Sequence, residues 1–230
     1  MNYLIVFVVL LAIYIAGVLF LKYLAKYKTL VNILFAIIIF ASYFYVVRYM
    51  YYDVGPDDWN FKNTLPTANV SPFMFCLVIV FWILPKKVRP SLFMLVSLLS
   101  LGMLVAGLGG CFVYIARDYK FHWTIALDCT AHVLISLWGI YLIKSGQMEL
   151  NVKKASQNGI IIVCVALGML IHNLAFDTAF FGLSLNGKHS IYNIVITNNS
   201  IVSAFVYFVG LFLVLKLGYA YQKILNMSKK

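Results

Sequence analysis

The sequence predicts an all-α polytopic membrane protein with seven transmembrane helices, an extracytoplasmic N-terminus and a cytoplasmic C-terminus. Three observations predict this: the composition, seven long apolar runs, and the distribution of basic residues between the runs. Of the 230 residues, 63% are hydrophobic and only 11% are charged. A soluble domain of this length cannot bury so much apolar side chain, because a large share of any soluble surface must be polar. We expect a single transmembrane domain over residues 1–230.

A helix that crosses the hydrocarbon needs about 20 mostly apolar residues. Seven segments are candidates, in chain order residues 2–24, 30–52, 70–84, 91–114, 121–143, 158–180 and 200–221. The first run follows Met1 directly, without a basic stretch or a small-residue cleavage site, which predicts a retained helix and not a removed signal peptide. The third run is the shortest and has Pro66 and Pro72 around its start. Its outer end is therefore expected to be irregular.

The orientation follows from the 18 lysines and arginines. Thirteen of them follow or close the first, third, fifth and seventh runs: Lys22, Lys26, Lys28, Lys86, Lys87, Arg89, Lys144, Lys153, Lys154, Lys216, Lys223, Lys229 and Lys230. The other side has five, together with four aspartates: Arg48, Lys62, Arg117, Lys120, Lys188, Asp53, Asp57, Asp58 and Asp118. Because basic residues are retained on the cytoplasmic side, the richer side is predicted to be cytoplasmic. The net charge of +11 is thus a topology signal, and no nucleic-acid partner is expected.

Small residues and cysteines inside the runs indicate packing. Gly102, Ala106 and Gly110 recur at every fourth position, which lets another helix approach closely. The four cysteines lie in or beside apolar runs and show no CxxC spacing. They are therefore interpreted as small buried hydrophobic residues.

Ionisable side chains inside the apolar runs mark the candidate site, since each costs a few kcal/mol in hydrocarbon. Asp128 and His132 share one face of the fifth run, and His172, Asn173 and Asp177 lie in the sixth. At 1.5 Å per residue, Asp128 lies roughly 10 Å, His172 roughly 12 Å and His132 roughly 16 Å below the outer surface. If these consecutive helices face each other, the five side chains form one polar cluster in the outer half of the membrane.

Two interpretations of the cluster stay open: a functional site, or polar pairs that only neutralise themselves and tie helices together. Arg48, at the outer end of the second run, is a candidate source of positive charge for the site. Two histidines and two aspartates are acceptable zinc ligands. Because the sequence has neither an HxxxH nor an HExxH motif, no metal or other cofactor is expected.

Acyl-transfer chemistry fits these residue types. A histidine held by a carboxylate is a general base, which gives this role to His132 with Asp128 as its partner. The base needs a nucleophile, and Thr67 is the best-placed hydroxyl on the outer approach to the third run. The cysteines are poorer candidates, because Cys76 lies deep in the third run and Cys129 points away from the face of Asp128 and His132.

Three short stretches carry a family resemblance. They are Leu-Pro-Thr at 65–67 with Asn-Val-Ser-Pro-Phe at 69–73, His-Val-Leu-Ile-Ser-Leu-Trp-Gly-Ile-Tyr-Leu at 132–142, and Asn-Leu-Ala-Phe-Asp-Thr-Ala-Phe-Phe at 173–181. Over residues 30–210 the chain resembles the YwaF-like bacterial integral membrane proteins. These are related to a eukaryotic transmembrane acyltransferase and, more distantly, to androgen-induced-gene-type threonine lipid hydrolases.

The resemblance implies a nucleophile after the proline that precedes the third helix, and a histidine base on a later helix. By this resemblance Thr67 takes the nucleophile position and His132 the position of the base. The sequence departs from the acyltransferases by having threonine where they have cysteine. It also has Ala68 and Asn69 where a histidine often follows.

The sequence thus predicts a membrane-embedded acyl hydrolase or acyltransferase that acts on membrane lipid from the extracytoplasmic side. The expected catalytic residues are Thr67, His132 and Asp128. The expected substrate-binding residues are Asn69, His172, Asn173, Asp177 and Arg48, with Asn173 or Asn69 holding the oxyanion. Two alternatives stay open: a transporter or binding protein for a small solute or protons, and an accessory membrane subunit without catalysis. All three place the chain in the cell membrane.

Overall fold

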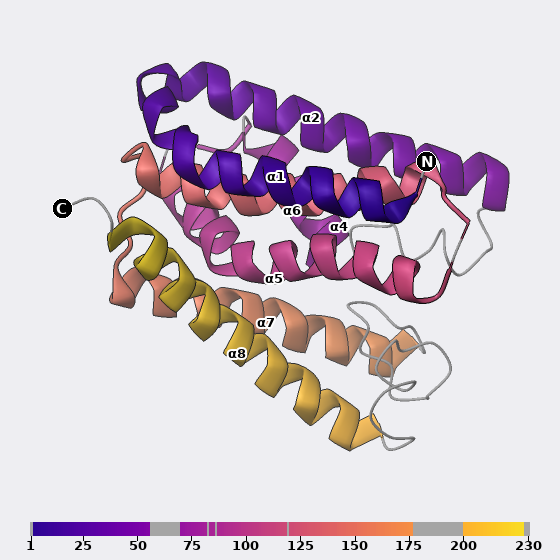
Figure 1. Ribbon diagram of the computed structural model, residues 1–230. Helices are drawn as coiled ribbons and strands as arrows, with labels where there is room; N and C mark the ends of the chain where they lie inside the picture. The colour runs from indigo at the N-terminus through magenta and orange to yellow at the C-terminus, as the bar shows by residue number, and fades with distance from the viewer. Residues whose placement is uncertain are drawn as a thin grey trace.

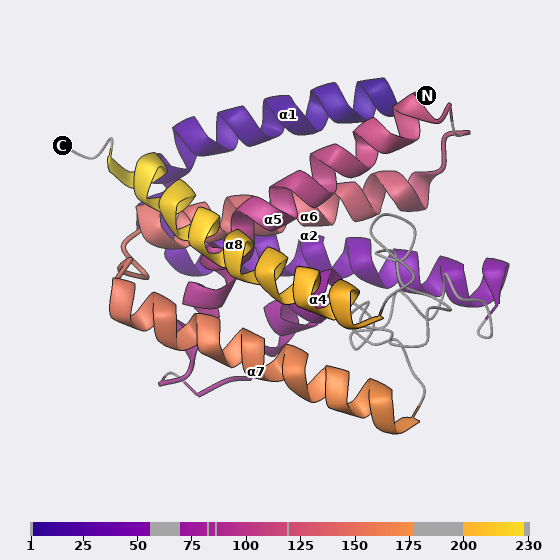
Figure 2. The ribbon, with the colours of Figure 1, turned by 90° about the horizontal axis from the view of Figure 1, so that it is seen from below.

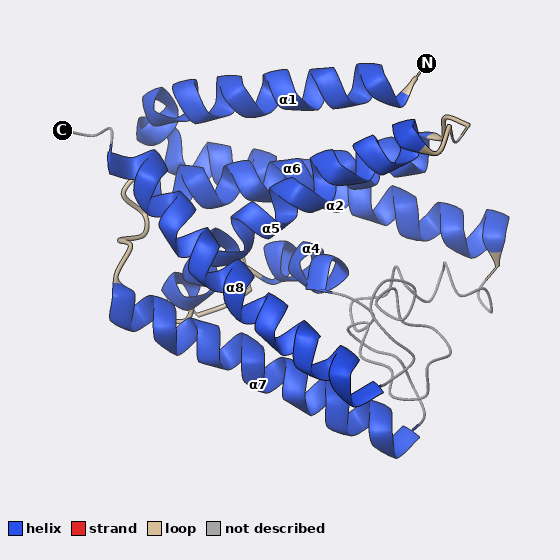
Figure 3. Ribbon diagram, turned by 60° about the horizontal axis from the view of Figure 1, so that its bottom comes forward, coloured by secondary structure: helices blue, strands red, loops and turns tan. Residues whose placement is uncertain are grey.

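The computed structural model describes residues 2–55, 70–81, 83–85, 87–118, 120–176 and 200–227. All regular elements in these ranges are helices (Figure 3). The predicted all-α fold is therefore confirmed for the described part of the chain. Figure 1 shows the long helices running lengthwise through the bundle, with α7 and α8 inclined to α1 and α2. Helices are expected here because a chain in hydrocarbon must satisfy its own backbone hydrogen bonds.

The first two helices run in opposite directions and both pack against a later helix, α6 (Trp123–Lys144) (Figure 1). Asn2 caps α1 (Tyr3–Phe20) through its side-chain oxygen, which accepts from the Leu4 amide at 3.1 Å. The short 3₁₀ helix η1 (Leu21–Tyr27) reverses the chain into α2 (Lys28–Tyr49). A single π-turn, η2 (Met50–Val54), ends α2, and Gly55 follows at φ 109°, a conformation that glycine accepts without strain.

The remaining helices are α4 (Val70–Val80), α5 (Arg89–Ala116), α6, α7 (Val152–Phe176) and α8 (Ser200–Met227). Each contains or overlaps one predicted run, but several boundaries differ. Pro90 in the first turn starts α5, because proline fits where an amide has no helical partner. His122 caps α6 by accepting from the Thr124 amide at 3.3 Å. α7 begins at Val152, six residues earlier than predicted, so that Lys153 and Lys154 lie within its first turn.

Two helices form the centre of the bundle. α5 and α6 pack against each other over their length, and their membrane-length segments are mostly buried. α1, α7 and α8 also contact α5, and Figure 2 shows α1 and α7 on opposite sides of this central pair. Glycines set the close approach: a Cβ added at Gly139 of α6 would lie 3.1 Å from the Ser97 Cα of α5. The Ser97 hydroxyl uses this proximity to donate to the Gly139 carbonyl at 3.1 Å.

The helix ends gather at two ends of the bundle. At one end the Tyr3 and Phe121 rings are 5.3 Å apart, and at the other Lys144 donates to the Val18 carbonyl. We call the second the basic end. In addition to Lys216, which lies further along α8, its described lysines and arginines are Lys22, Lys26, Lys28, Lys87, Arg89, Lys144, Lys153, Lys154 and Lys223. The described charges of the opposite end are Arg48, Asp53, Arg117, Asp118 and Lys120. The fold therefore separates the two charge groups as predicted.

Five helical segments of the described chain are long and apolar enough to cross a membrane: Tyr3–Val54, Arg89–Ala116, Trp123–Lys144, Val152–Ile171 and Phe205–Asn226. The first, 52 residues long, reverses direction at η1 (Figure 1). These findings fit a multi-pass membrane protein. α4 has 11 residues and is about 17 Å long at 1.5 Å per residue, less than the hydrocarbon thickness of about 30 Å. The number of seven crossings and the orientation stay predictions.

A buried polar network ties α2 to the C-terminal end of α6 at the basic end. Asn32 of α2 accepts from the Trp138 indole nitrogen at 2.9 Å and donates to the Gln147 side-chain oxygen at 2.7 Å. Gln147 in turn donates to the Ser145 hydroxyl at 2.8 Å. Nearby, the Tyr141 hydroxyl donates to the Leu24 carbonyl at 3.1 Å, which fastens η1 to the same helix. The network therefore fixes the reversal between α1 and α2 against α6.

Candidate functional site

His132 lies within the transmembrane segment of α6, with only 7% of its surface exposed. It is nine residues from Trp123, the first residue of α6, and thus about 14 Å from the start of the helix. Phe75 of α4 packs on its imidazole edge-to-face, with the ring centroids 5.0 Å apart. Tyr43 of α2 lies behind Phe75, at 5.3 Å between rings. The histidine is thus enclosed where α2, α4 and α6 meet.

The opposite wall of this region is formed by α5, which approaches at a glycine. A Cβ added at Gly107 would lie 2.8 Å from the Cys129 carbonyl oxygen and 3.1 Å from the His132 Cβ. Cys129 itself is buried toward α5, with its sulfur 3.4 Å from the position of a Cβ at Gly110.

One hydrogen bond fixes the proton on the imidazole ring. The His132 Nδ1 atom lies 2.8 Å from the backbone carbonyl oxygen of Asp128, one turn earlier. A carbonyl oxygen only accepts, so the bond requires a proton on Nδ1. In the neutral ring, Nε2 then holds the lone pair. No described residue forms a hydrogen bond with Nε2, which leaves this nitrogen available as a proton acceptor.

The Asp128 side chain lies beside His132 but is not hydrogen-bonded to its ring. Its carboxylate oxygen Oδ1 lies 3.7 Å from His132 Nδ1, beyond hydrogen-bond distance, and 46% of the side chain is exposed. The sequence assigns Asp128 to orient His132 through its carboxylate. In the structure the backbone carbonyl of the same residue does so, because a turn of α-helix brings that carbonyl next to a side chain four positions later.

The other predicted site residues are not brought together with His132 among the described side chains. Arg48 is exposed, and its guanidinium lies 5.9 Å from the ring centroid of Tyr52, one turn along the same stretch of chain. His172 and Asn173 belong to α7, but their side chains are outside the described part of the structure. Thr67, Asn69 and Asp177 also lie outside the described residues.

The packing of α7 bears on the predicted polar cluster. Consecutive helices are expected to face each other, yet α6 and α7 form no extensive contact among the described residues. α7 packs against α5 and α8 instead. The expected direct meeting of α6 with α7 is therefore wrong for the described parts of these helices.

Several features around His132 were missed by the sequence interpretation. Phe75, Tyr43 and Gly107 all shape the enclosure of His132, and none carries a charge at neutral pH. Of these residues only Gly107 could have been noticed in the sequence, because it lies close to Gly109 and Gly110 in the fourth run, and small residues allow close helix contact. Within the described chain, no three His, Cys, Asp or Glu side chains gather closely enough to hold a metal ion.

Comparisons with known proteins add no relative: no protein-family model, curated protein or solved structure matches the chain. The resemblance to the YwaF-like proteins therefore rests on the three sequence stretches alone.

Proposed function

We propose that the protein is a membrane-embedded acyl hydrolase or acyltransferase in which His132 is the general base. The observation that supports this is the hydrogen bond from His132 Nδ1 to the Asp128 carbonyl, which leaves the lone pair on Nε2. A buried imidazole held in this tautomer is suited to remove a proton from a hydroxyl nucleophile. Packing by Phe75, with Tyr43 behind it, also limits the water around the imidazole, so that the proton taken from the nucleophile stays on His132 for the leaving alkoxide.

The chemical steps are those of nucleophilic acyl transfer. Thr67, assigned from the sequence alone, attacks the ester carbonyl of a membrane lipid while His132 Nε2 takes the hydroxyl proton. The tetrahedral intermediate collapses, the bond to the alcohol breaks, and the protonated His132 returns the proton to the leaving alkoxide. Water, or the hydroxyl of an acceptor, then attacks the acyl-threonine with His132 again as the base. The acyl–threonine bond breaks, His132 returns the proton to the Thr67 oxygen, and the acyl group leaves as a fatty acid or as a new ester.

Labelling of the purified protein with a fluorophosphonate tests this proposal, with mass spectrometry used to locate the modified peptide. We expect label on Thr67, and a labelling rate at least about 100-fold lower in His132→Ala, because a general base contributes about 10²–10⁴-fold. Ser136→Ala is the matched control, since Ser136 is buried one turn further along α6 and has no assigned role. Equal labelling of the His132→Ala variant and the control would show that His132 is not the base. Label only at other residues would show that Thr67 is not the nucleophile.

A second candidate, a transporter for protons or a small cation, is favoured by one observation. The Asp128 carboxylate lies on a membrane-length helix, is nearly half exposed, and is not hydrogen-bonded to the His132 ring. A carboxylate in this position is available to a proton or a cation.

Asp128→Asn separates the two candidates. For the enzyme, we expect a loss of less than about 10-fold in labelling, since the Asp128 carbonyl that orients His132 is unchanged and only a carboxylate 3.7 Å away is neutralised. For the transporter, the same change stops flux into vesicles that contain a pH- or cation-sensitive dye, while Thr67→Ala leaves the flux unchanged. If Asp128→Asn loses labelling as completely as His132→Ala, the Asp128 carboxylate takes a direct part in catalysis.

A further inference from the structure

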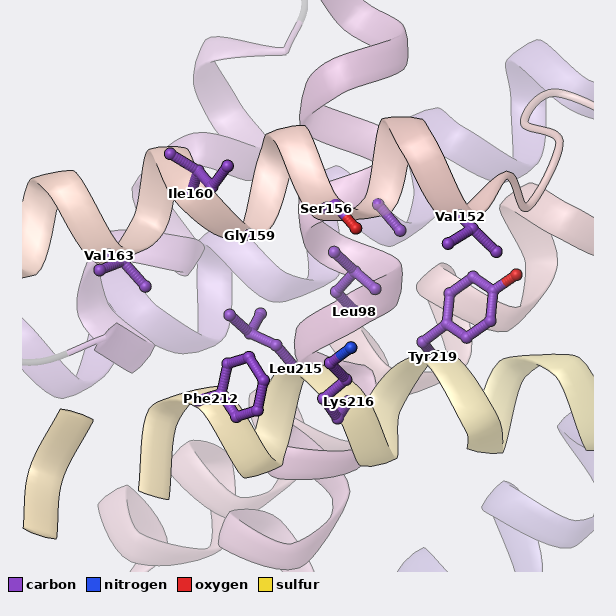
Figure 4. Close-up of a pocket in the computed structure, with 11 residues that line it drawn as sticks. Leu98, Val152, Ser156, Gly159, Ile160, Val163, Phe212, Leu215, Lys216 and Tyr219 are labelled. Atoms are coloured by element: carbon purple, nitrogen blue, oxygen red, sulfur yellow. The ribbon is translucent and has the colours of Figure 1, made fainter. Parts of the chain in front are cut away.

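A groove lies between α7 and α8 in the half of the bundle toward the basic end, over the side of α5 (Figure 4). It encloses about 370 Å³, within the range of about 300–1,000 Å³ typical of small-ligand sites. Leu98, Ala155 and Leu215 are buried and form its floor, whereas Ile160 and Phe212 are exposed and form its rims. The groove is therefore open toward the outside of the bundle, where the lipid of a membrane would be.

The lining of the groove changes character along its length. Figure 4 shows Tyr219, Lys216 and Ser156 toward one end, with the Lys216 nitrogen directed into the space between α7 and α8. Toward the other end lie only apolar side chains, among them Val163 and Phe212. The polar part is the one near the start of α7, at the basic end. A ligand with one charged end and a long apolar part fits this arrangement.

Lys216 lies beside the polar part of the groove, and its ammonium group lies 5.3 Å from the ring centroid of Phe212, one turn earlier on α8. Its neighbour across the groove, Ser156, is one turn from Val152, the first residue of α7. One turn is about 5 Å, so a lysine at this depth reaches the membrane surface if its ammonium group turns away from Phe212. The exposed Lys153 in the first turn of α7 adds positive charge beside the mouth of the groove.

The charges of this end select the sign of the ligand. Among the described residues of the basic end, Glu149 is the one acidic side chain, against nine lysines and arginines besides Lys216. We propose that the groove between α7 and α8 binds an anionic phospholipid, with its phosphate at Lys216 and an acyl chain along Ile160, Val163 and Phe212. A second copy of the chain is a poorer occupant, because it would bring its own basic end to this surface and almost no negative charge.

A photoreactive lipid tests the assignment on the full-length protein in vesicles. The probe is phosphatidylglycerol with a diazirine in one acyl chain, compared with phosphatidylcholine that carries the same chain, and the cross-linked peptides are identified by mass spectrometry. We expect cross-links on the parts of α7 and α8 that line the groove, with phosphatidylglycerol preferred. Lys216→Gln should lower this preference about five-fold, since a lysine near an anionic surface contributes about 1 kcal/mol.

Two further variants make the result specific to the groove. Lys223→Gln removes a charge from the same end of α8 without touching the groove, and should leave the preference unchanged. Gly159→Phe fills the groove, because a Cβ at this position points at Leu215, 3.6 Å away, and should lower cross-linking by both lipids. Equal effects of the two lysine variants would contradict the proposal. A second outcome would also contradict the proposal: native mass spectrometry that shows a lipid-free dimer for the unchanged protein and a monomer for Gly159→Phe. That result would mean that a second copy of the chain fills the groove.

Discussion

Gly218→Ala is expected to lower the free energy of unfolding by about 1–3 kcal/mol, although it adds only one methyl group. Gly218 of α8 faces the backbone of α5, and an added Cβ would meet the Leu98 carbonyl oxygen and lie only 2.8 Å from its carbon atom. A flexible side chain could move aside, but a helix backbone cannot, because its own hydrogen bonds hold it in place. The two helices would have to separate.

Separation would also break the polar contact beside this glycine. Gln222, fully buried and one turn further along α8, donates to the Ser100 hydroxyl of α5 at 2.7 Å. We therefore expect a lower thermal midpoint in detergent for Gly218→Ala. Gly210→Ala on the same helix is the control, because a Cβ there meets nothing within 4 Å. Its midpoint should be unchanged or slightly higher, since alanine favours a helix over glycine. Equal midpoints for the two variants would show that α5 and α8 do not approach at Gly218.

Asn32→Leu is expected to destabilise the protein by about 1–3 kcal/mol, the cost of leaving buried polar groups without partners. Leucine has a similar volume, but it neither accepts from the Trp138 indole nor donates to Gln147. Trp138 is completely buried, so its N–H would lose its acceptor with no water to replace it. The connection between α2 and the end of α6 would weaken at the same time.

The matched control is Asn158→Leu. Asn158 is about as buried as Asn32, but its side chain donates to the Lys154 carbonyl of its own helix, so its replacement leaves no buried donor unpaired. We expect a change of less than about 1 kcal/mol for this variant. The measurement is the thermal midpoint of both variants in the same detergent. A double variant with Trp138→Phe should lose less than the sum of the two single changes, because the indole N–H is then absent.

The candidate site was predictable only in part. An ionisable His132 inside an apolar run is visible in the sequence, because such residues are costly in hydrocarbon. The hydrogen bond that holds its ring goes to the backbone carbonyl of Asp128, with the carboxylate 3.7 Å away, and a residue pattern cannot distinguish these two oxygens. Phe75, which packs on the imidazole, is one of 18 phenylalanines, and nothing in the pattern distinguishes it from the others.

The sequence by itself determined the helical class, the approximate position of each helix and the separation of charge between the two ends. It does so because a chain in hydrocarbon must satisfy its backbone hydrogen bonds locally, so that each apolar run becomes a helix. Tertiary structure alone decided which helices meet. α6 and α7 are consecutive, yet α7 packs against α5 and α8. The apolar residues surround these helices on all sides, so no face is marked for contact. Neighbours are chosen instead where backbones can approach, as at Gly139 and Gly218.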